Sequence, residues 1–293
     1  MEFQQRVIML EPSRQPHRLL SIVVLLVLGC GIAQVKAAEL SLTSRDLDAW
    51  ARFPQGSWKL VRTVTQSYDI QGNPTQTTTV ETQTTLSKVD DRGMCLKIDV
   101  STQVNGRRIE GVPQQIEQGF WGQPMDQPAT ERIVGQNKLL IEGTEVPCTI
   151  HEASFSDGKH HTVSKQYVSP NQTPFVLKRE TLTTVGENTT PRYRTVSEVY
   201  ALQMPCKIGN EIKIASHERI VRQTPEETLI SLDVTVPEIP GGVVTRTTKE
   251  LDTSGKLIRH STMEIISYHI ANENDPPREQ RRRRLFNRDQ AKK

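Results

Sequence analysis

Histidines come first among the residues of this sequence that could do chemistry. His160 and His161 are adjacent, and adjacent residues of a strand point to opposite faces, so their rings cannot bind one metal ion together. They follow Asp157-Gly158, a pair typical of an exposed turn. The remaining histidines have no second ligand at a useful spacing. The sequence therefore predicts no metal site, and it predicts no other cofactor.

Nucleophiles and carboxylates are present, but not at catalytic spacings. The chain has no Gly-x-Ser-x-Gly elbow and no glycine-rich phosphate loop. Asp90-Asp91 leads into Arg92-Gly93, which indicates a turn and not an acid and base pair. We therefore predict no catalytic residue and favour a non-enzymatic protein. An unrecognised hydrolase stays open, because catalytic triads are assembled in space and leave no trace in sequence.

Residues 1–37 have the three parts of a signal peptide. Arg14 and Arg18 precede an almost unbroken apolar run from Leu19 to Ala33, and Val35-Lys36-Ala37 offers small residues for cleavage. This pattern predicts export to the periplasm, the cell envelope or the exterior.

Two alternatives for this leader stay open. An uncleaved membrane anchor would need roughly 20 apolar residues, and the run is shorter than that. Val27-Leu28-Gly29-Cys30 resembles a lipobox, which would make the chain a lipoprotein lipidated at Cys30, although leucine at position 28 fits that motif poorly. The other interpretation is that Cys30 is one more small residue of the apolar run.

The charge of the chain is unevenly distributed. Of the net +3, residues 1–37 carry +2 and residues 272–293 carry +4, which leaves −3 for the residues between them. Phosphate binding needs a basic face, so this balance argues against nucleic acid as a partner.

Residues 271–293 form a basic tail with almost no apolar content, which is typical of a disordered segment. The functional alternative is contact with an anionic membrane or envelope polymer, where each basic residue contributes about 1 kcal/mol near a charged surface. The residues predicted to make that contact are Arg281, Arg282, Arg283 and Arg284.

After Gly56, apolar residues recur with period two, which predicts strands. A short helix with Ser44 as its N-cap is predicted before them. Threonine-rich strands suit antiparallel sheets with one solvated face. The sequence thus predicts an all-β, mainly antiparallel fold, either one large curved sheet of meanders or two related half-sheets. The clearest strand ends at the Asn105-Gly106 hairpin turn, and one of its faces carries Met94, Leu96, Ile98 and Val100.

Two β regions are expected, residues 38–142 and residues 143–270, with the second continuous with the first. Residues 111–137 of the first have no sustained period and predict a long loop, which is uncommon unless the loop covers something. Phe120 and Trp121 either pack back onto the sheet or line a ligand mouth. Together with the four apolar residues of the clearest strand, they are the predicted ligand-binding residues.

An internal repeat covers the second region, with units at 143–200 and 201–270. Val146 to Ile150 recurs as Met204 to Ile208 at an offset of 58, and Arg179 matches Arg246 at an offset of 67. Offsets that rise along the chain indicate loop insertions between the strands of two meanders.

Three cysteines follow the leader, so at most one disulfide forms. The repeat makes Cys148 with Cys206 the first candidate pair. The alternative is that Cys95, Cys148 and Cys206 are each small buried apolar residues.

Several segments resemble exported bacterial proteins of unknown function. These are Gly56-Ser57-Trp58, the threonine-rich hairpin ending at Leu86, Asn105-Gly106, and Pro240-Gly241-Gly242-Val243-Val244. The architecture they suggest is similar to the curved antiparallel sheets of periplasmic lipoprotein carriers. This resemblance implies a compartment and a fold, and it brings no activity with it.

Our leading hypothesis is a non-enzymatic envelope protein that binds an apolar or amphiphilic ligand, such as a lipid, or a protein partner on its curved sheet. The segment at 111–137 would cover that ligand. The alternative from another class is a structural module whose threonine-rich faces and repeated units serve self-association.

Overall fold

The computed structural model describes residues 42–104, 107–186 and 191–272. The chain divides into two units, residues 1–39 and 40–293, and every described residue belongs to the second. Its elements are α1 (Ser44–Leu47), β1 (Trp58–Tyr68), β2 (Pro74–Asp90), β3 (Gly93–Val104), β4 (Arg107–Glu110), β5 (Gln114–Gln118), β6 (Thr130–Ile141), β7 (Thr144–Ser156), β8 (His160–Val168), β9 (Val176–Val185), β10 (Tyr193–Ile208), β11 (Glu211–Gln223), β12 (Glu227–Thr235), β13 (Val243–Asp252) and β14 (Leu257–His269).

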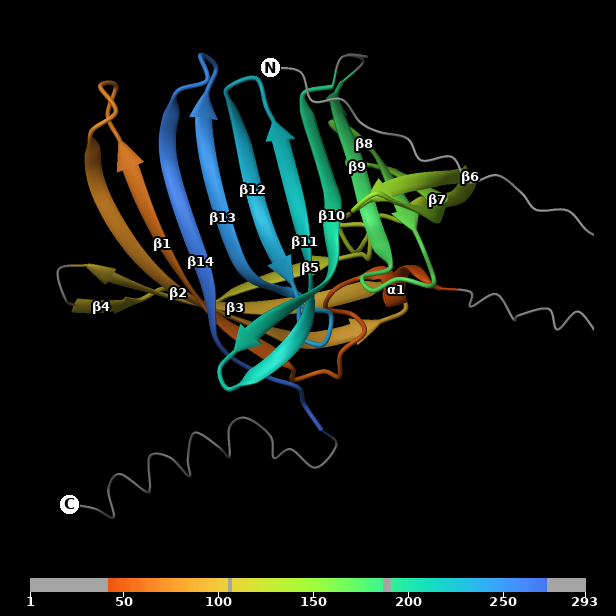
Figure 1. Ribbon diagram of the computed structural model, residues 1–293, viewed down its shortest axis with the longest axis horizontal. Helices are drawn as coiled ribbons and strands as arrows, with labels where there is room; N and C mark the ends of the chain where they lie inside the picture. Colours follow the sequence, from red (N-terminus) through yellow and green to blue (C-terminus); the bar gives the residue numbers. More distant parts are fainter. Residues whose placement is uncertain (1–41, 105–106, 187–190, 273–293) are drawn as a thin grey trace, which may run out of the picture. The chain divides into compact units, whose positions relative to one another are not determined.

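These strands form one antiparallel sheet (Figure 1). The order is β4-β3-β2-β1-β14-β13-β12-β11-β10-β9-β8-β7-β6, and β5 pairs with β3. Most neighbours are consecutive in sequence, as expected for meanders joined by tight turns. The pairing of β1 with β14 joins the start of the chain's β part to its end. The predicted fold class is confirmed, with a single open sheet in place of two half-sheets.

Aspartates fix several of the hairpin turns by the same contacts. The Oδ1 atom of Asp69 accepts the backbone N–H groups of Gln71 and Asn73, each at 2.8 Å. Asp157 and Asp252 accept backbone N–H groups of their own turns in the same way. Hydrogen bonds from backbone N–H groups favour the carboxylate, and with the contacts to His160 they lower the pKa of Asp157 to about 2. The Asp157-Gly158 turn predicted from sequence is therefore present.

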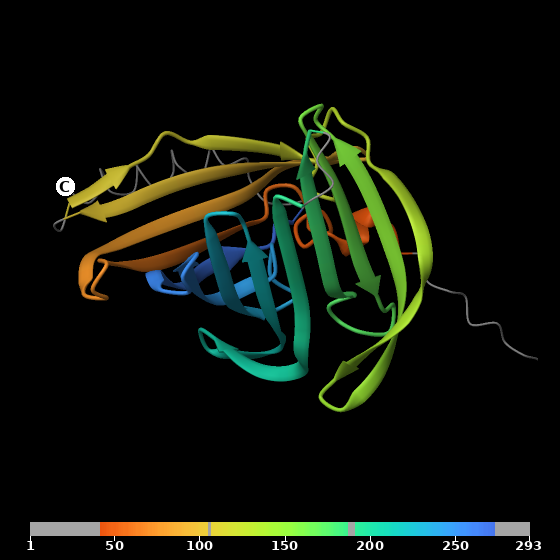
Figure 2. The same ribbon diagram turned by 90° about the horizontal axis from the view of Figure 1, so that it is seen from above.

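The sheet curls, and the segment that contains α1 lies on the inside of the curve (Figure 2). The helix is only one turn long and its N-cap is Thr43, not Ser44 as predicted. Thr43 takes the cap because its hydroxyl accepts the N–H of Asp46 while the Asp46 carboxylate accepts the N–H of Thr43, which is a capping box. Residues 48–53 then continue as turns into β1.

The apolar residues are divided among three clusters along this sheet. One joins Ala51 and Phe53 to β2 and β3, a second lies where β6 and β7 approach β10, and a third surrounds the β12–β13 connection. The clusters are small because much of the sheet surface carries threonine, serine and charged residues. The chain segment inside the curve therefore supplies part of the core.

Residues 111–137 are not the structureless loop that we predicted. They contain β5, which adds to β3, and the first part of β6, which pairs with β7. Both strands lie at the ends of the sheet, where polar side chains remain in water, so they show no apolar period for a sequence to reveal. Only the part between them, residues 119–129, connects the two ends.

Candidate functional site

One face of the sheet lies inside the curve, and we call it the inner face. Residues directly opposite each other in antiparallel strands share a face. Starting from Arg179 on β9, the strand registers define one continuous row on the inner face, here called the inner row. Its members are Gln166, Arg179, Ser197, Ile220, Ser231, Thr248, Ser261, Thr65 and Thr78.

Hydroxyl groups dominate the inner row and bond to one another across strands. Ser231 and Thr248 are 2.8 Å apart, and Thr65 and Ser261 are 2.9 Å apart. Each hydroxyl keeps further hydrogen-bonding capacity, since it has one donor and two acceptor positions. Except for Gln166 and Ser231, which are buried, these side chains are half-buried. The row is thus a sheltered polar surface that a ligand can reach.

Residues 48–53 close one end of the inner face. Their position depends on the β12–β13 connection, where Gly241 donates its N–H to the carbonyl of Ala49 at 3.0 Å. A Cβ atom at Gly241 would lie 2.5 Å from the ring of Trp50, so this position needs glycine for close approach as well as for its positive φ of 69°. Arg52 donates to the Pro237 carbonyl at 2.8 Å.

Charged groups gather beside this closed end. Arg246 forms a two-point ion pair with Asp233, with Nε–Oδ1 at 2.8 Å and Nη2–Oδ2 at 2.5 Å. Burial raises the pKa of Glu218, which lies opposite Asp233 on the next strand and accepts a hydrogen bond from Ser197. Burial and the nearby Arg246 lower the pKa of Lys59 to about 8. The Lys59 ammonium donates to the carbonyls of Gly241 and Val243 at 3.3 and 3.0 Å.

Arg179 lies on the same face, on β9, four strands from the β13 strand that carries Arg246, and it has no such partner. Its guanidinium makes no hydrogen bond and no ion pair within 4 Å to any residue that the structure describes. Burial lowers the pKa of Arg179, and the carboxylates of Asp48 and Glu218 act in the opposite direction from further away. The Asp48 carboxylate has local partners, since its Oδ1 atom accepts the N–H groups of Trp50 and Ala51 at 2.7 and 2.9 Å.

The hairpins β8–β9 and β12–β13 correspond residue by residue at an offset of 67. Ser164 and Thr181 share a 3.0 Å hydroxyl contact, as Ser231 and Thr248 do. The connection 169–175 is closed by a 2.8 Å bond from the Ser169 N–H to the Phe175 carbonyl, and 236–242 by the equivalent 2.9 Å bond. The registers pair Gln166 with Arg179 and Asp233 with Arg246. An amide therefore stands beside one arginine where a carboxylate stands beside the other.

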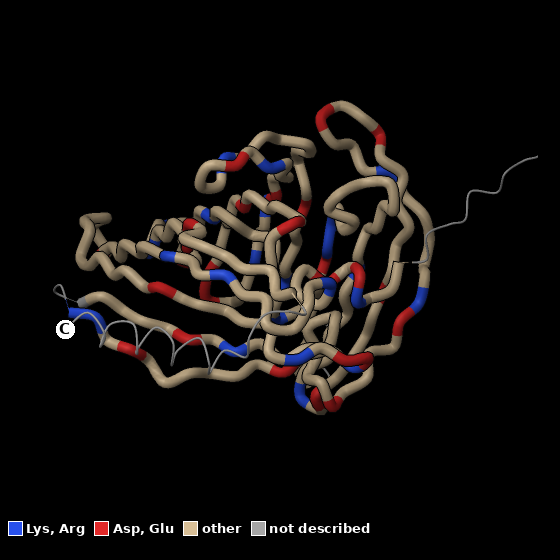
Figure 3. The backbone as a smooth tube through the Cα atoms, turned by 90° about the horizontal axis from the view of Figure 1, so that it is seen from below, with Lys and Arg blue, Asp and Glu red and all other residues tan. Residues whose placement is uncertain are grey.

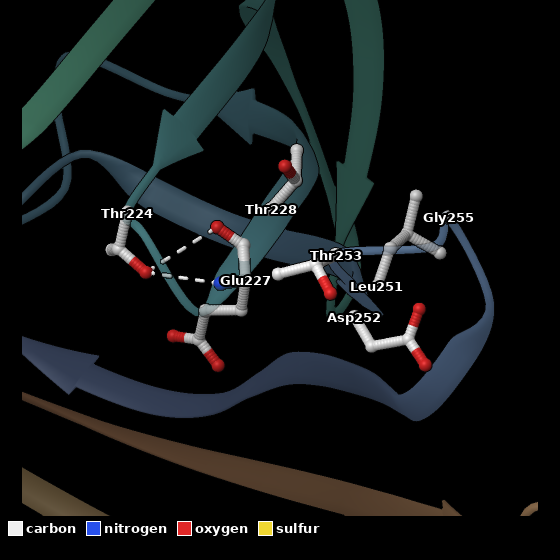
Figure 4. A pocket seen from close by; sticks show the side chains of 7 residues that line it. All are labelled: Thr224, Glu227, Thr228, Leu251, Asp252, Thr253 and Gly255. Atoms are coloured by element: carbon white, nitrogen blue, oxygen red, sulfur yellow. Dashed lines mark hydrogen bonds between the residues drawn. The ribbon is translucent and has the colours of Figure 1, made fainter.

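A separate cavity of about 320 Å³ opens between the β11–β12 and β13–β14 turns (Figure 4). Thr224, Glu227 and Asp252 are among its lining residues. The hydroxyl of Thr224 bonds the backbone of Glu227, and the Asp252 carboxylate accepts N–H groups of its own turn. These polar groups have local partners, so we assign the cavity no role.

The predicted ligand-binding residues are part of the core or border it. Met94 and Leu96 are buried against Ala51 and Phe53, with Phe120 packed on the same cluster, and Trp121 is also buried. Ile98 and Val100 are half-buried on the same face. The chain's own segment 48–53 thus covers the start of the apolar strand face that we expected to receive a ligand.

The other candidate residues make local contacts. His160 bonds the Asp157 carboxylate at 2.9 Å within their turn. Within the described residues, no group of three or more histidines, cysteines and carboxylates is placed to hold a metal ion, and no helix is long and apolar enough to span a membrane. Residues 1–37, with Cys30, the Asn105-Gly106 turn and the arginines 281–284 all lie outside the described residues.

The candidate disulfide is not formed. Cys95, Cys148 and Cys206 are all free thiols. Cys148 belongs to the cluster near β6 and β10, whereas Cys206 packs with the cluster at the β12–β13 connection. Two residues that correspond in a repeat do not meet when the repeated units lie side by side along a sheet.

Sequence reasoning missed Gln166, Asp233 and Glu218 entirely. The matching arginines were visible, and extending the offset of 67 backward would have aligned Ser164 with Ser231 and Gln166 with Asp233. Basic and acidic residues are interspersed along the strands (Figure 3), so charge density alone does not mark this site.

No protein-family model matches the chain, and no curated protein matches it in sequence. Matching solved structures include a candidate exported protein with a YmcC-like fold from Bacteroides fragilis, 10% identical, covering 73% of this chain and 98% of that one at a TM-score of 0.27. A candidate lipoprotein from Parabacteroides distasonis is 11% identical, covers 76% and 98%, and has a TM-score of 0.28. MucB in complex with MucA is 12% identical, covers 74% and 94%, and has a TM-score of 0.16. These scores are too low to carry an argument about function, so the chain's own residues must carry it.

Proposed function

We propose that this chain is an exported, non-enzymatic envelope protein that holds an extended segment of a protein partner along its inner face. The observation that carries the proposal is the inner row, in which cross-strand hydroxyl groups lead to Arg179 and Gln166. Peptide groups offer the donors and acceptors that such a row can bind, at spacings set by the strands.

The polar character of the row favours a peptide over an acyl chain. Covering hydroxyl and charged groups with hydrocarbon removes their water without giving them new hydrogen bonds, which costs free energy for each group. The apolar side chains predicted to bind a lipid are partly occupied by Ala51 and Phe53. The excess of positive charge near Arg179 also suits a partner with an acidic group.

The proposal also covers where the chain acts and how its matched hairpins arose. The basic flank, apolar run and small residues of segment 1–37 support export. The basic residues 281–284 would add contact with an anionic surface of the envelope. The matched contacts of β8–β9 and β12–β13 support duplication of one hairpin unit, which would explain why a long row repeats the same hydroxyl pairs.

A peptide-binding experiment with paired variants tests this function. The full chain is screened against fluorescent 12-residue peptides, and the best binders are measured by anisotropy. Thr248→Arg puts a large charged group in the middle of the inner row, and we expect it to abolish binding. Thr247→Arg makes the same change one residue earlier, on the opposite face of β13, and should leave affinity unchanged.

Three outcomes would contradict the proposal. Equal affinities for the two variants would remove the inner face as the binding surface. If native mass spectrometry recovers an acyl lipid bound to the unchanged chain and none bound to Thr248→Arg, the hypothesis of an amphiphilic ligand is favoured. Sedimentation that shows concentration-dependent oligomers, with no peptide bound, would favour the self-associating module.

A further inference from the structure

The guanidinium of Arg179 is the group on the inner face with the largest unmet demand for a partner. It carries five N–H donors on a half-buried side chain, so part of its water is removed and no protein acceptor replaces it. None of those donors reaches a described acceptor within ion-pair or hydrogen-bond distance. A ligand that presents an anion would meet this demand.

The second hairpin shows which group satisfies this position. In β12–β13 the equivalent arginine, Arg246, is held by both oxygens of the Asp233 carboxylate. Asp233 is 1% exposed, so its carboxylate is fully enclosed on the same face. A planar carboxylate therefore fits the geometry that these matched registers give to an arginine.

Gln166 occupies the place of Asp233 in the first hairpin and puts a neutral amide beside the arginine. Its side chain is 2% exposed, and its Oε1 atom has no partner among the described residues. An oxygen in that position accepts a hydrogen bond and cannot neutralise Arg179. The pair thus offers donors for an anion and, beside them, one acceptor for an N–H or O–H group.

The wider surroundings do not compensate Arg179. Four cations face the closed end of the inner face, Arg52, Lys59, Arg179 and Arg246, against the three carboxyl groups of Asp48, Glu218 and Asp233. Asp233 is paired with Arg246, and the carboxyl groups of Asp48 and Glu218 accept local hydrogen bonds. One positive charge remains in excess, which favours an anionic ligand.

We infer that Arg179 and Gln166 form a carboxylate-binding site for a peptide-like ligand. Arg179 donates to the carboxylate, and Gln166 Oε1 accepts the amide N–H that precedes it. A chain-terminal carboxylate supplies both groups at adjacent positions, and the inner row continues from the site for the rest of the segment. The inference rests on the proposed function and names the group that its partner presents.

Small probes separate the two contacts. N-acetylglycine carries a carboxylate and one amide N–H, N-acetylglycinamide lacks the carboxylate, and acetate lacks the amide. In the full chain labelled with ¹⁵N, we expect the Arg179 Nε–H resonance, identified by its loss in Arg179→Gln, to shift saturably with N-acetylglycine. Acetate should bind more weakly, and N-acetylglycinamide should cause no shift.

Variants then test the two residues. Arg179→Gln should weaken N-acetylglycine binding, followed on the backbone amides of β8 and β9, by about tenfold or more. Gln166→Asp should also remove binding, because it places a carboxylate beside Arg179 as Asp233 does beside Arg246. Arg219→Gln is the control, since Arg219 lies on the outer face in an exposed 3.6 Å ion pair with Glu198. If Arg179→Gln fails to fold, Gln166→Asp decides the question.

The inference is overturned if N-acetylglycinamide produces the same shifts, or if Gln166→Asp binds N-acetylglycine like the unchanged chain. Its failure is distinguishable from that of the proposed function. Peptides that bind in a Thr248→Arg-sensitive way regardless of their terminal carboxylate would leave the function standing without this site. Saturable N-acetylglycine binding with no peptide bound along the row would leave the site without the function.

Discussion

The hairpins β8–β9 and β12–β13 have the same registers, the same connection lengths and the same serine–threonine contacts, yet they use their arginines differently. Arg246 is locked to Asp233, whereas Arg179 faces the neutral Gln166. A carboxylate opposite the arginine gives an internal ion pair, whereas an amide in the same place leaves the arginine without a counterion. Backbone likeness between two units says little about function until the side chains opposite each charge are compared.

Removing each arginine in turn should change the free energy of unfolding by very different amounts in the two hairpins. Arg246→Gln leaves Asp233 buried without a partner, and we expect the free energy of unfolding to fall by about 3 kcal/mol. Arg179→Gln removes a half-buried charge that has no partner among the described residues, so the free energy of unfolding should stay the same or rise. Urea unfolding of both variants measures the difference, and equal losses would show that Arg179 is paired in the folded chain.

The two connections should also respond differently to added volume. Gly241→Ala forces a Cβ atom to 2.5 Å from Trp50 at a positive φ, and we expect a loss of about 2 kcal/mol or more. Gly143→Ala is the control, because Gly143 has a similar φ of 79° with nothing within 4 Å of its added Cβ atom. In thermal unfolding, Gly241→Ala should have a lower midpoint temperature than Gly143→Ala. An equal ranking would mean that residues 48–53 do not press on this connection.

A pH dependence of stability is expected from Lys59, which reaches the second hairpin from β1. Lys59 donates to carbonyls of the 236–242 connection and β13, and its pKa in the folded chain is about 8, below the usual value for lysine. Because the unfolded chain then binds more protons between pH 8 and the usual lysine pKa, the free energy of unfolding should rise with pH through that window. Below pH 8, Lys59 is protonated in the folded and the unfolded chain, so its contribution to the free energy of unfolding should not change with pH.

The variant Lys59→Met isolates that contribution. We expect it to remove the alkaline rise seen in chemical unfolding curves measured at several pH values. A rise of the same size in the variant would assign the effect to other lysines. The first hairpin has no equivalent amine at its connection in the contacts described, so changes there should leave the alkaline rise intact.

Alternation was enough to predict most of the strands. The β3 strand and the other strands after Gly56 follow the period of two in the sequence. The edge strands β5 and β6 escaped prediction, since both are largely exposed and neither alternates apolar with polar residues. The short helix was predicted, but its cap was displaced by one residue because a reciprocal bond between Thr43 and Asp46 decides it.

By itself, the sequence determined an antiparallel β fold with a leader-like start, a basic end and two matched arginines, because these features depend on local periodicity, composition and spacing. Only the tertiary structure decided which arginine is paired. The partner of each is set by the register of a neighbouring strand and by the curvature that buries one face, and neither can be read from residues taken one segment at a time.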